Sequence, residues 1–210
     1  MTIEVRTLSL VEFDAAWDLQ RRLAAEVTPR RGFLLLLEHP PVITLGKNAD
    51  ARNVLDPGEI PLRRTDRGGD VTYHGPGQLV GYPIVDVRRM GVRTFVRALE
   101  DSLLDLLAGF GIPARRREGA VGVWTDRGKI AFLGLRVSGG VSTHGFALNV
   151  CNDLEPFRRI NPCGLRGCPV TSMSLELGRP VAVAEVAARF RLRLPAGAAE
   201  KELTNIKSRL

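Results

Sequence analysis

The sequence predicts an α+β fold: a single domain in which helices pack on one mixed, largely antiparallel sheet. Its 210 residues suit one domain over residues 1–210, and no linker divides the chain into two large parts. Hydrophobic residues make up 44% of the chain and charged residues 25%, which is enough apolar surface to build a core. Strand and helix patterns mix along the chain without the strict alternation of a doubly wound fold.

The N-terminal part of the chain predicts several strands and one helix. Residues 3–8 alternate apolar and polar side chains, as a strand does. Residues 11–27 predict a helix because five apolar residues lie near one face: Phe13, Ala16, Trp17, Leu23 and Val27. Further strands are expected at 33–38, 42–45 and about 62–66, with a turn-rich segment before the last of them.

The middle of the chain predicts a loop, a strand and a long helix. Residues 67–78 are too rich in glycine for regular structure, whereas 79–86 predict a strand. Thr94 is expected to cap a helix whose apolar residues recur every three or four positions. Gly111 and Pro113 are expected to end that helix.

The C-terminal part predicts a three-stranded antiparallel meander, because two short turns separate three apolar segments: 120–125, 129–137 and 142–150. An irregular loop rich in Cys, Pro and Gly follows at 151–171. A helix is expected from Val183 to Leu192, and the last 15 residues are expected to be helix or a loosely packed tail.

The apolar runs and the cysteines argue against a membrane-spanning, a secreted and a disulfide-rich protein. The longest apolar run, Phe33 to Leu37, is far shorter than the ~20 residues of a membrane span, so no membrane contact is expected. The N-terminus lacks a basic segment followed by an apolar one, and no signal peptide is predicted. Three cysteines are an odd number, which argues against a disulfide scaffold and for a reducing compartment. A cytoplasmic location is therefore expected.

The charge balance leaves two interpretations open. Lys and Arg together number 30 against 23 acidic residues, and the formal net charge is +7. Such a surplus suits an acidic partner: a nucleic acid, an acidic protein or a phosphorylated ligand. The alternative is an arginine-rich composition whose charge only keeps the protein in solution.

Residues 67–78, RGGDVTYHGPGQ, form the first candidate site. Their glycines let the backbone approach a ligand closely, and Arg67, Tyr73 and His74 supply a cation, an aromatic wall and a titratable ring. The pattern matches neither of the common glycine-rich phosphate loops. The alternative is a tight turn in which His74 is only structural.

Lys129 and the cysteines form the other candidates. Lysine is rare in this chain, and a buried Lys129 at the start of an apolar strand is suited to act as a base or activator; an ammonium in water is the commoner case. Cys163 and Cys168 lie on a Pro- and Gly-shaped loop, where a thiol can be activated. No close cysteine pair exists, so a zinc site is disfavoured. A thiol hydrolase that pairs a cysteine with His74 or His144 stays open, and spacing alone does not choose between the two cysteines.

Several motifs in order resemble one known family. They are RGGDVTYHGPGQ (67–78), KIAFLGLRV (129–137), THGFALNV (143–150) and NPCG (161–164), preceded by EHPPVITLGK (38–47). Together these motifs are highly specific, and the match runs from about residue 33 to residue 175. They resemble the octanoyltransferases of lipoate biosynthesis, the lipoyl(octanoyl) transferases.

The resemblance implies a fold like the catalytic module of biotin and lipoate protein ligases, and an acyltransferase activity in protein lipoylation. The octanoyl donor would be octanoyl-acyl carrier protein. The acceptors would be lysines of lipoyl domains in 2-oxoacid dehydrogenases and of the glycine cleavage H protein. No cofactor, metal, nucleic acid or membrane is implied.

The resemblance also implies roles for particular residues. Cys163 would carry the acyl group as a thioester, and Lys129 would activate it. Backbone N–H groups near Gly75, Gly77 or Gly145 are candidates for holding the oxyanion. The turn 138–140 lacks the arginines that relatives often carry there, which puts in doubt any partner contact at that turn. Substrate contacts would come from three runs: Arg67, Gly68, Gly69, Asp70, Val71, Thr72, Tyr73 and His74; Phe132, Leu133 and Gly134; Gly145, Phe146 and Ala147.

Two alternative functions remain. An ATP-dependent lipoate–protein ligase on the same fold would not need a nucleophilic cysteine, so Cys163 and the lack of a clear phosphate loop argue against it. A non-catalytic RNA- or protein-binding module would fit the positive charge. Only 6% of residues are aromatic, and none lies among the basic clusters 63–64 and 115–117, which argues against base stacking.

Overall fold

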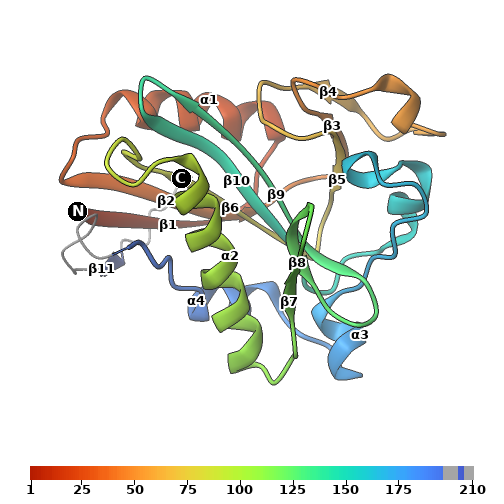
Figure 1. Cartoon of the computed structure of the whole chain (residues 1–210). Helices are drawn as coiled ribbons and strands as arrows, with labels where there is room; N and C mark the ends of the chain where they lie inside the picture. The colour runs from red at the N-terminus through yellow and green to blue at the C-terminus, as the bar shows by residue number, and fades with distance from the viewer. Residues whose placement is uncertain (196–202, 206–210) are drawn as a thin grey trace.

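The main sheet has eight strands in the order β11-β1-β2-β6-β10-β9-β8-β7 in the computed structural model, which describes residues 1–195 and 203–205 (Figure 1). β1 (Thr2–Leu10) runs parallel to its neighbours β2 (Arg31–Glu38) and β11 (Leu203–Asn205). Every other pair of neighbours in this sheet is antiparallel. This confirms the predicted mixed, largely antiparallel sheet.

The predicted meander is also confirmed. It consists of β8 (Ala120–Trp124), β9 (Lys129–Ser138) and β10 (Val141–Asn149), and β10 pairs with β6 (Gln78–Ile84). The structure adds an edge strand that the sequence did not predict, β7 (Arg115–Arg117). Three successive arginines show no apolar alternation, so pairing with β8 gives this segment its extended form.

A second, three-stranded sheet has the order β4-β3-β5. Its strands are β3 (Val42–Leu45), β4 (Leu62–Arg64) and β5 (Val71–His74). The prediction that 67–78 has no regular structure is therefore wrong for β5 and for Gln78, which begins β6. The physical reason is that the four residues of β5 contain no glycine and pair antiparallel with β3.

Helices cover both faces of the main sheet (Figure 1). The side chains of β2 alternate between two cores. Phe33, Leu35 and Leu37 pack in the core that includes Ala16 and Leu23 of α1 (Phe13–Ala25). Leu34 and Leu36 pack in the core of α2 (Val92–Gly109) and α4 (Val183–Arg189) on the other face. A strand buried on both faces explains the uninterrupted apolar run in the sequence.

Several predicted helix limits need correction. α2 begins at Val92 with Gly91 before it, so Thr94 is not the cap. A short helix that the sequence did not predict, α3 (Met173–Leu177), begins after Ser172, whose Oγ accepts a hydrogen bond from Leu175 N at 3.4 Å. α4 ends at Arg189 because the next residue, Phe190, is extended. Short 3-10 turns at Ala51–Asn53, Glu155–Arg159 and Pro162–Gly164 complete the elements.

The predicted helix or tail at the C-terminus lies mostly outside the described residues, at 196–202 and 206–210. The three described residues of this segment form β11 and not a helix. Over residues 1–195 and 203–205, no helix combines the length and the apolar character needed to cross a membrane.

All three histidines of the chain are buried: His39, His74 and His144. His39 Nδ1 donates to Val11 O at 2.6 Å, and Tyr82 Oη donates to His39 Nε2 at 2.7 Å. These bonds give both nitrogens of the neutral ring a hydrogen-bond partner. They also connect the segment before α1 to β6. Burial lowers the pKa of His39 to about 4.

This pKa predicts acid-sensitive stability. Unfolded chains bind a proton at this histidine below the ordinary pKa of about 6.5, whereas the folded protein binds it only near pH 4. The stabilisation is therefore complete above pH 6.5 and is lost as pH falls through that window, by up to about 1.4 kcal/mol per pH unit. Urea unfolding at several pH values should show a shallower acid slope for His39→Asn than for the wild type. Equal slopes in the two proteins would contradict the lowered pKa.

Candidate active site

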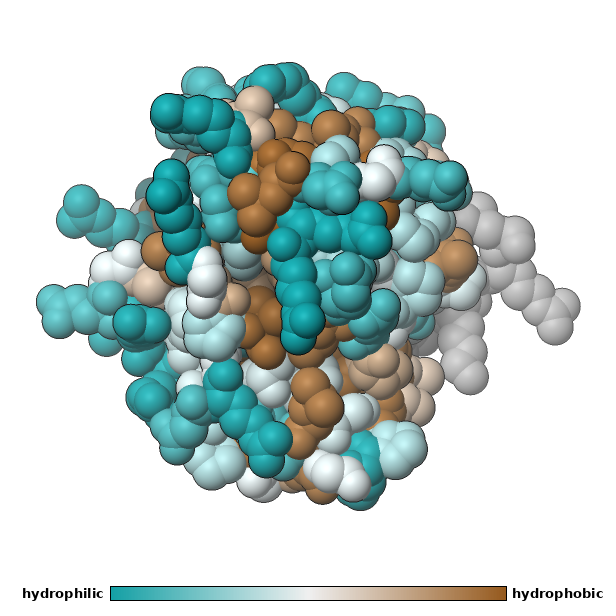
Figure 2. Space-filling view, turned by 90° about the vertical axis from the view of Figure 1, so that its right-hand side faces the viewer, coloured by the Kyte–Doolittle hydropathy of each residue, from teal (hydrophilic) through white to brown (hydrophobic). Residues whose placement is uncertain are grey.

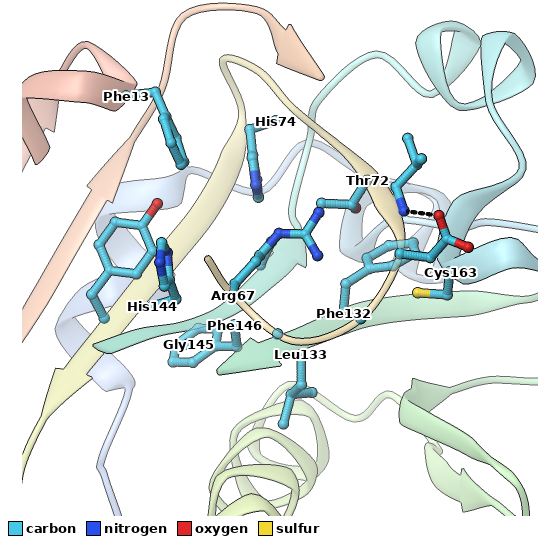
Figure 3. Close-up of a pocket in the computed structure, with 16 residues that line it drawn as sticks. Phe13, Arg67, Thr72, His74, Phe132, Leu133, His144, Gly145, Phe146 and Cys163 are labelled. Atoms are coloured by element: carbon cyan, nitrogen blue, oxygen red, sulfur yellow. Dashed lines mark hydrogen bonds between the residues drawn. The ribbon is translucent and has the colours of Figure 1, made fainter. Parts of the chain in front are cut away.

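A pocket of about 450 Å³, its open mouth included, lies where α1, the small sheet and the main sheet meet (Figure 3). Three residues that the sequence did not single out as binding residues also line it: Phe13, Tyr82 and His144. Phe13 and Tyr82 occupy ordinary apolar positions of a helix and a strand, so nothing in the pattern marks them. Most of the predicted site residues line this pocket: Arg67, Gly69, Asp70, Val71, Thr72, His74, Phe132, Leu133, Gly134, Gly145, Phe146, Ala147 and Cys163.

Strand register explains why separate runs of sequence meet here. Residues 132–134 of β9 and 145–147 of β10 are paired one to one. Gly68 N donates to Leu135 O at 2.7 Å, which lays the segment after β4 across these strands. At Gly134 a Cβ atom would lie 3.0 Å from Gly68 O, so glycine permits this close approach.

Three predicted residues lie outside the pocket lining: Gly68, Tyr73 and Lys129. Tyr73 points to the other face of β5, where its ring packs edge-on against Phe157 with 5.5 Å between centroids. Gly68 acts through its backbone and accepts a hydrogen bond from Arg67 Nη1 at 3.1 Å. Lys129 approaches Cys163 from beside the pocket.

The Lys129 ammonium donates a hydrogen bond to the Cys163 sulfur, with 3.2 Å between Nζ and Sγ. Lys129 is 1% exposed, so the buried alternative for this lysine is the correct one. Its Nζ lies over the rings of Trp124 and Phe132, 5.3 and 4.9 Å from their centroids. Aromatic faces attract a cation, so the two rings accommodate the buried ammonium beside the Cys163 sulfur.

The backbone of Lys129 is held at both polar groups. Its N–H donates to Pro169 O at 2.8 Å, and its carbonyl accepts from Thr171 N at 3.1 Å. On β8, a Cβ atom at Gly122 would lie 2.6 Å from Lys129 Cε, so this glycine leaves room for the lysine side chain. These contacts fix the backbone of Lys129 and leave space for its side chain to reach Cys163.

Cys163 is held in an unusual backbone conformation, with φ +57°. A non-glycine residue in the left-handed region is strained, and such strain persists only where the surroundings fix it. Here Asn161 N donates to Asn53 O at 2.7 Å, and Asn53 Nδ2 donates to Asp70 Oδ2 at 2.7 Å. Gly164 has φ +73°, and a Cβ atom there would lie 2.9 Å from Asp70 Oδ2. The NPCG motif thus needs glycine in its last position.

Arg67 places a buried cation in the pocket. Its guanidinium donates to Thr44 O at 2.6 Å, to Thr44 Oγ1 at 3.0 Å and to Gly68 O at 3.1 Å. Within the described part of the chain, no carboxylate forms an ion pair with it. Burial lowers the pKa of Arg67 to about 10, while the charge of Cys163 is the largest influence that raises it. At neutral pH the guanidinium is still charged.

His74 belongs to a buried polar network. Gln78 Nε2 donates to Asn149 Oδ1 at 2.9 Å, so Gln78 Oε1 accepts from His74 Nδ1 at 2.8 Å. The free Nε2 of His74 lies 3.5 Å from Thr44 Oγ1. Burial, followed by the charge of His39, lowers the pKa of His74 to about 3.

His144 is engaged elsewhere in the pocket wall: its Nε2 donates to Asp66 Oδ1 at 2.7 Å, and burial lowers its pKa. The hydrogen-bond partner of Cys163 is a lysine and not a histidine. The geometry therefore does not support the thiol hydrolase that pairs a cysteine with His74 or His144. It also separates the cysteines: Cys163 lines the pocket and contacts Lys129, whereas burial raises the pKa values of Cys151 and Cys168.

Comparison with known proteins agrees with this architecture. The lipoyl protein ligase A/B catalytic domain family matches residues 12–194. The octanoyltransferase of Geotalea uraniireducens is 53% identical over 190 residues, covering 89% of this chain and 88% of the relative. The octanoyltransferase of Geobacter metallireducens is 51% identical over 195 residues, covering 91% of each chain.

Among solved structures, the ATP-bound crystal structure of a lipoate–protein ligase A has the same fold. Its TM-score is 0.76 at 16% identity, covering 94% of this chain and 91% of the ligase chain. This likeness confirms the predicted ligase-like module. The sequence relatives carry the finer assignment: the chain belongs to the octanoyltransferases of the lipoyl protein ligase A/B catalytic domain family.

Proposed function

We propose that this octanoyltransferase carries the octanoyl group as a thioester on Cys163. The donor would be octanoyl-acyl carrier protein. The acceptor would be a lysine of a lipoyl domain, in 2-oxoacid dehydrogenases and the glycine cleavage H protein. The observation that carries the proposal is the 3.2 Å contact between Lys129 Nζ and Cys163 Sγ, beside a pocket that has apolar residues in its lining. Residues 1–210 would act as one catalytic domain in the cytoplasm, without cofactor, metal or nucleic acid.

In the first half-reaction, the Cys163 thiolate attacks the carbonyl carbon of the donor thioester. The new carbon–sulfur bond replaces the old one, so the exchange is nearly balanced in energy. The leaving thiolate takes a proton from the Lys129 ammonium and departs as a thiol. Lys129 is then a neutral amine.

In the second half-reaction, the acceptor lysine loses two protons. One passes from its ammonium to the Lys129 amine, which restores the ammonium. The neutral acceptor amine attacks the acyl carbon, the second proton passes to solvent, and Cys163 leaves as thiolate. Lys129 thus returns to its starting form with the amide product.

The pocket supports binding of the hydrocarbon chain. Phe132, Leu133, Phe146 and Ala147 give it apolar walls. An octanoyl group has seven carbons beyond its carbonyl, and burial at about 0.8 kcal/mol per CH₂ contributes roughly 5 kcal/mol. Six of the other predicted substrate contacts line the pocket and would surround the acyl carbonyl end: Arg67, Gly69, Asp70, Val71, Thr72 and His74.

Incubation with octanoyl-acyl carrier protein should leave one octanoyl group on Cys163, found by intact mass and peptide mapping. Cys163→Ala should form no adduct and transfer nothing, because the nucleophile is lost. Cys168→Ala is the matched control and should behave as wild type. An adduct on Cys168 with Cys163 unmodified would overturn the assignment.

Substitutions of Lys129 should distinguish the effect of its positive charge from the effect of the proton transfer that it carries out. Lys129→Met should slow both half-reactions. Lys129→Arg keeps the charge but holds its proton at neutral pH, so transfer to the acceptor lysine should fall by roughly 10²-fold or more. Single-turnover rates of each half-reaction test this, with thermal melting as the folding control. A Lys129→Arg enzyme with a normal second half-reaction would limit Lys129 to an electrostatic role.

The surface beside the Cys163 loop supports docking of an acidic protein. Arg117 and Arg166 line a shallow hollow with Leu165 and Cys168, and Glu118 is the one acidic residue among the described residues of its lining. Within residues 1–195 and 203–205, neither arginine has an acidic partner within ion-pair distance. Figure 2 views the molecule from the side that carries this loop, where hydrophilic side chains surround apolar ones.

Charge reversal should test that docking surface. Arg166→Glu should raise KM for the acyl carrier protein donor and weaken its dependence on salt between about 0.05 and 0.5 M. A small neutral octanoyl thioester should react as before. Arg89→Glu changes the same charge on the loop before α2, at the opposite side in Figure 1, and is the control. Equal effects of the two reversals would remove the support for a specific patch.

A further inference from the structure

The Thr72 hydroxyl is the unexplained polar group of the pocket. Thr72 is 7% exposed, and its Oγ1 has no hydrogen-bond partner among the described residues. β5 pairs antiparallel with β3, which places Thr72 directly opposite Thr44. Thr44 Oγ1 is engaged by the Arg67 guanidinium at 3.0 Å, whereas the equivalent group of Thr72 is not. A buried hydroxyl without a partner is unfavourable, so its partner is expected to be a bound substrate.

The position of Thr72 indicates which substrate atom is the hydrogen-bond partner of its hydroxyl. Thr72, Arg67 and Cys163 line the same pocket, and the Thr72 side chain lies beside the guanidinium (Figure 3). The octanoyl chain is hydrocarbon except for its carbonyl. The carbonyl oxygen is therefore the one atom of the acyl group that accepts a hydrogen bond from this hydroxyl.

One of the backbone N–H groups that could hold the oxyanion already has a hydrogen-bond partner. Gly77 N, one of the backbone donors expected from the sequence for the oxyanion, donates to Glu38 Oε2 at 2.6 Å. Gly75 does not line the pocket, although Gly145 does. The side chains of Thr72 and Arg67 are thus better placed to hold the oxyanion than the backbone N–H groups of Gly75 and Gly77.

We propose that the Thr72 hydroxyl donates a hydrogen bond to the acyl carbonyl oxygen and stabilises the oxyanion of each tetrahedral intermediate, assisted by the positive charge of Arg67. The inference rests on the proposed thioester chemistry at Cys163. When the nucleophile attacks, the π electrons of the C=O bond move to that oxygen. They re-form the carbonyl when the leaving sulfur departs. The hydrogen bond is strongest while the oxygen is charged.

The test compares Thr72→Val with Thr72→Ser. Valine has nearly the shape of threonine without the hydroxyl, and serine keeps the hydroxyl. The measured quantity is the rate of acyl-Cys163 formation by rapid-quench mass spectrometry at saturating octanoyl donor. Thr72→Val should be about 100-fold slower, with little change in the donor concentration at half-saturation, because the interaction strengthens only in the transition state. Thr72→Ser should stay within several-fold of wild type.

Folding provides an independent readout. Thr72→Val removes a buried hydroxyl without a partner, so its unfolding midpoint in urea should equal or exceed that of wild type. A purely structural role for Thr72 would instead lower both stability and rate.

Three outcomes would overturn the proposal while the wild type still forms acyl-Cys163. The first is a Thr72→Val enzyme that forms acyl-Cys163 at the wild-type rate. The second is a Thr72→Ser enzyme that is as slow as Thr72→Val. The third is a Thr72→Val enzyme in which only the donor concentration at half-saturation changes. A wild type that forms no acyl-enzyme would overturn the Cys163 thioester itself, so the two failures are distinguishable.

Discussion

The contact between the Lys129 ammonium and the Cys163 sulfur is the interaction on which the rest of this site depends. A buried ammonium is unfavourable unless it has polar partners. Here the two aromatic faces and the thiol surround it, and Lys129 is almost fully inaccessible to water. The sulfur therefore serves as a hydrogen-bond partner for the buried ammonium. Removing the thiol leaves the buried ammonium without its sulfur partner.

Holding this pair together requires segments that are far apart in the sequence. The lysine begins β9, and its backbone is bonded to residues 169 and 171. The cysteine loop is held by Asn53, whose side chain bonds Asp70 and whose carbonyl accepts from Asn161. Asn53 lies in the turn-rich segment before β4, so this segment positions Cys163. The second sheet thus does more than cover the main sheet: through β5 and Asp70 it fixes the strained backbone of Cys163.

Periodicity predicted most of the fold, and motifs predicted most of the residues that line the pocket. The two-faced strand β2 and the meander follow directly from apolar patterns, because these patterns report burial. β5 was missed because flanking glycines hide four residues whose strand form depends on pairing with β3. Lys129 was ambiguous because a lone lysine gives no sign of burial. Tyr73 was assigned to the pocket because the motif contains it, but strand alternation turns it away. Phe13 and Tyr82 reach the pocket through tertiary packing alone.

The ionisation states around the pocket match the charge that the proposed transfer generates. Each covalent step places negative charge on sulfur or on the carbonyl oxygen. Arg67 in the pocket and Lys129 at Cys163 supply positive charge, and no carboxylate of the described residues lies within ion-pair distance of Arg67. The histidines nearby have lowered pKa values, so they are neutral at pH 7 and act as poor bases. This arrangement leaves Lys129 as the group suited to move protons. His74 contributes in a different way, because its unprotonated Nε2 lies 3.5 Å from the hydroxyl of Thr44, which accepts a hydrogen bond from the Arg67 guanidinium.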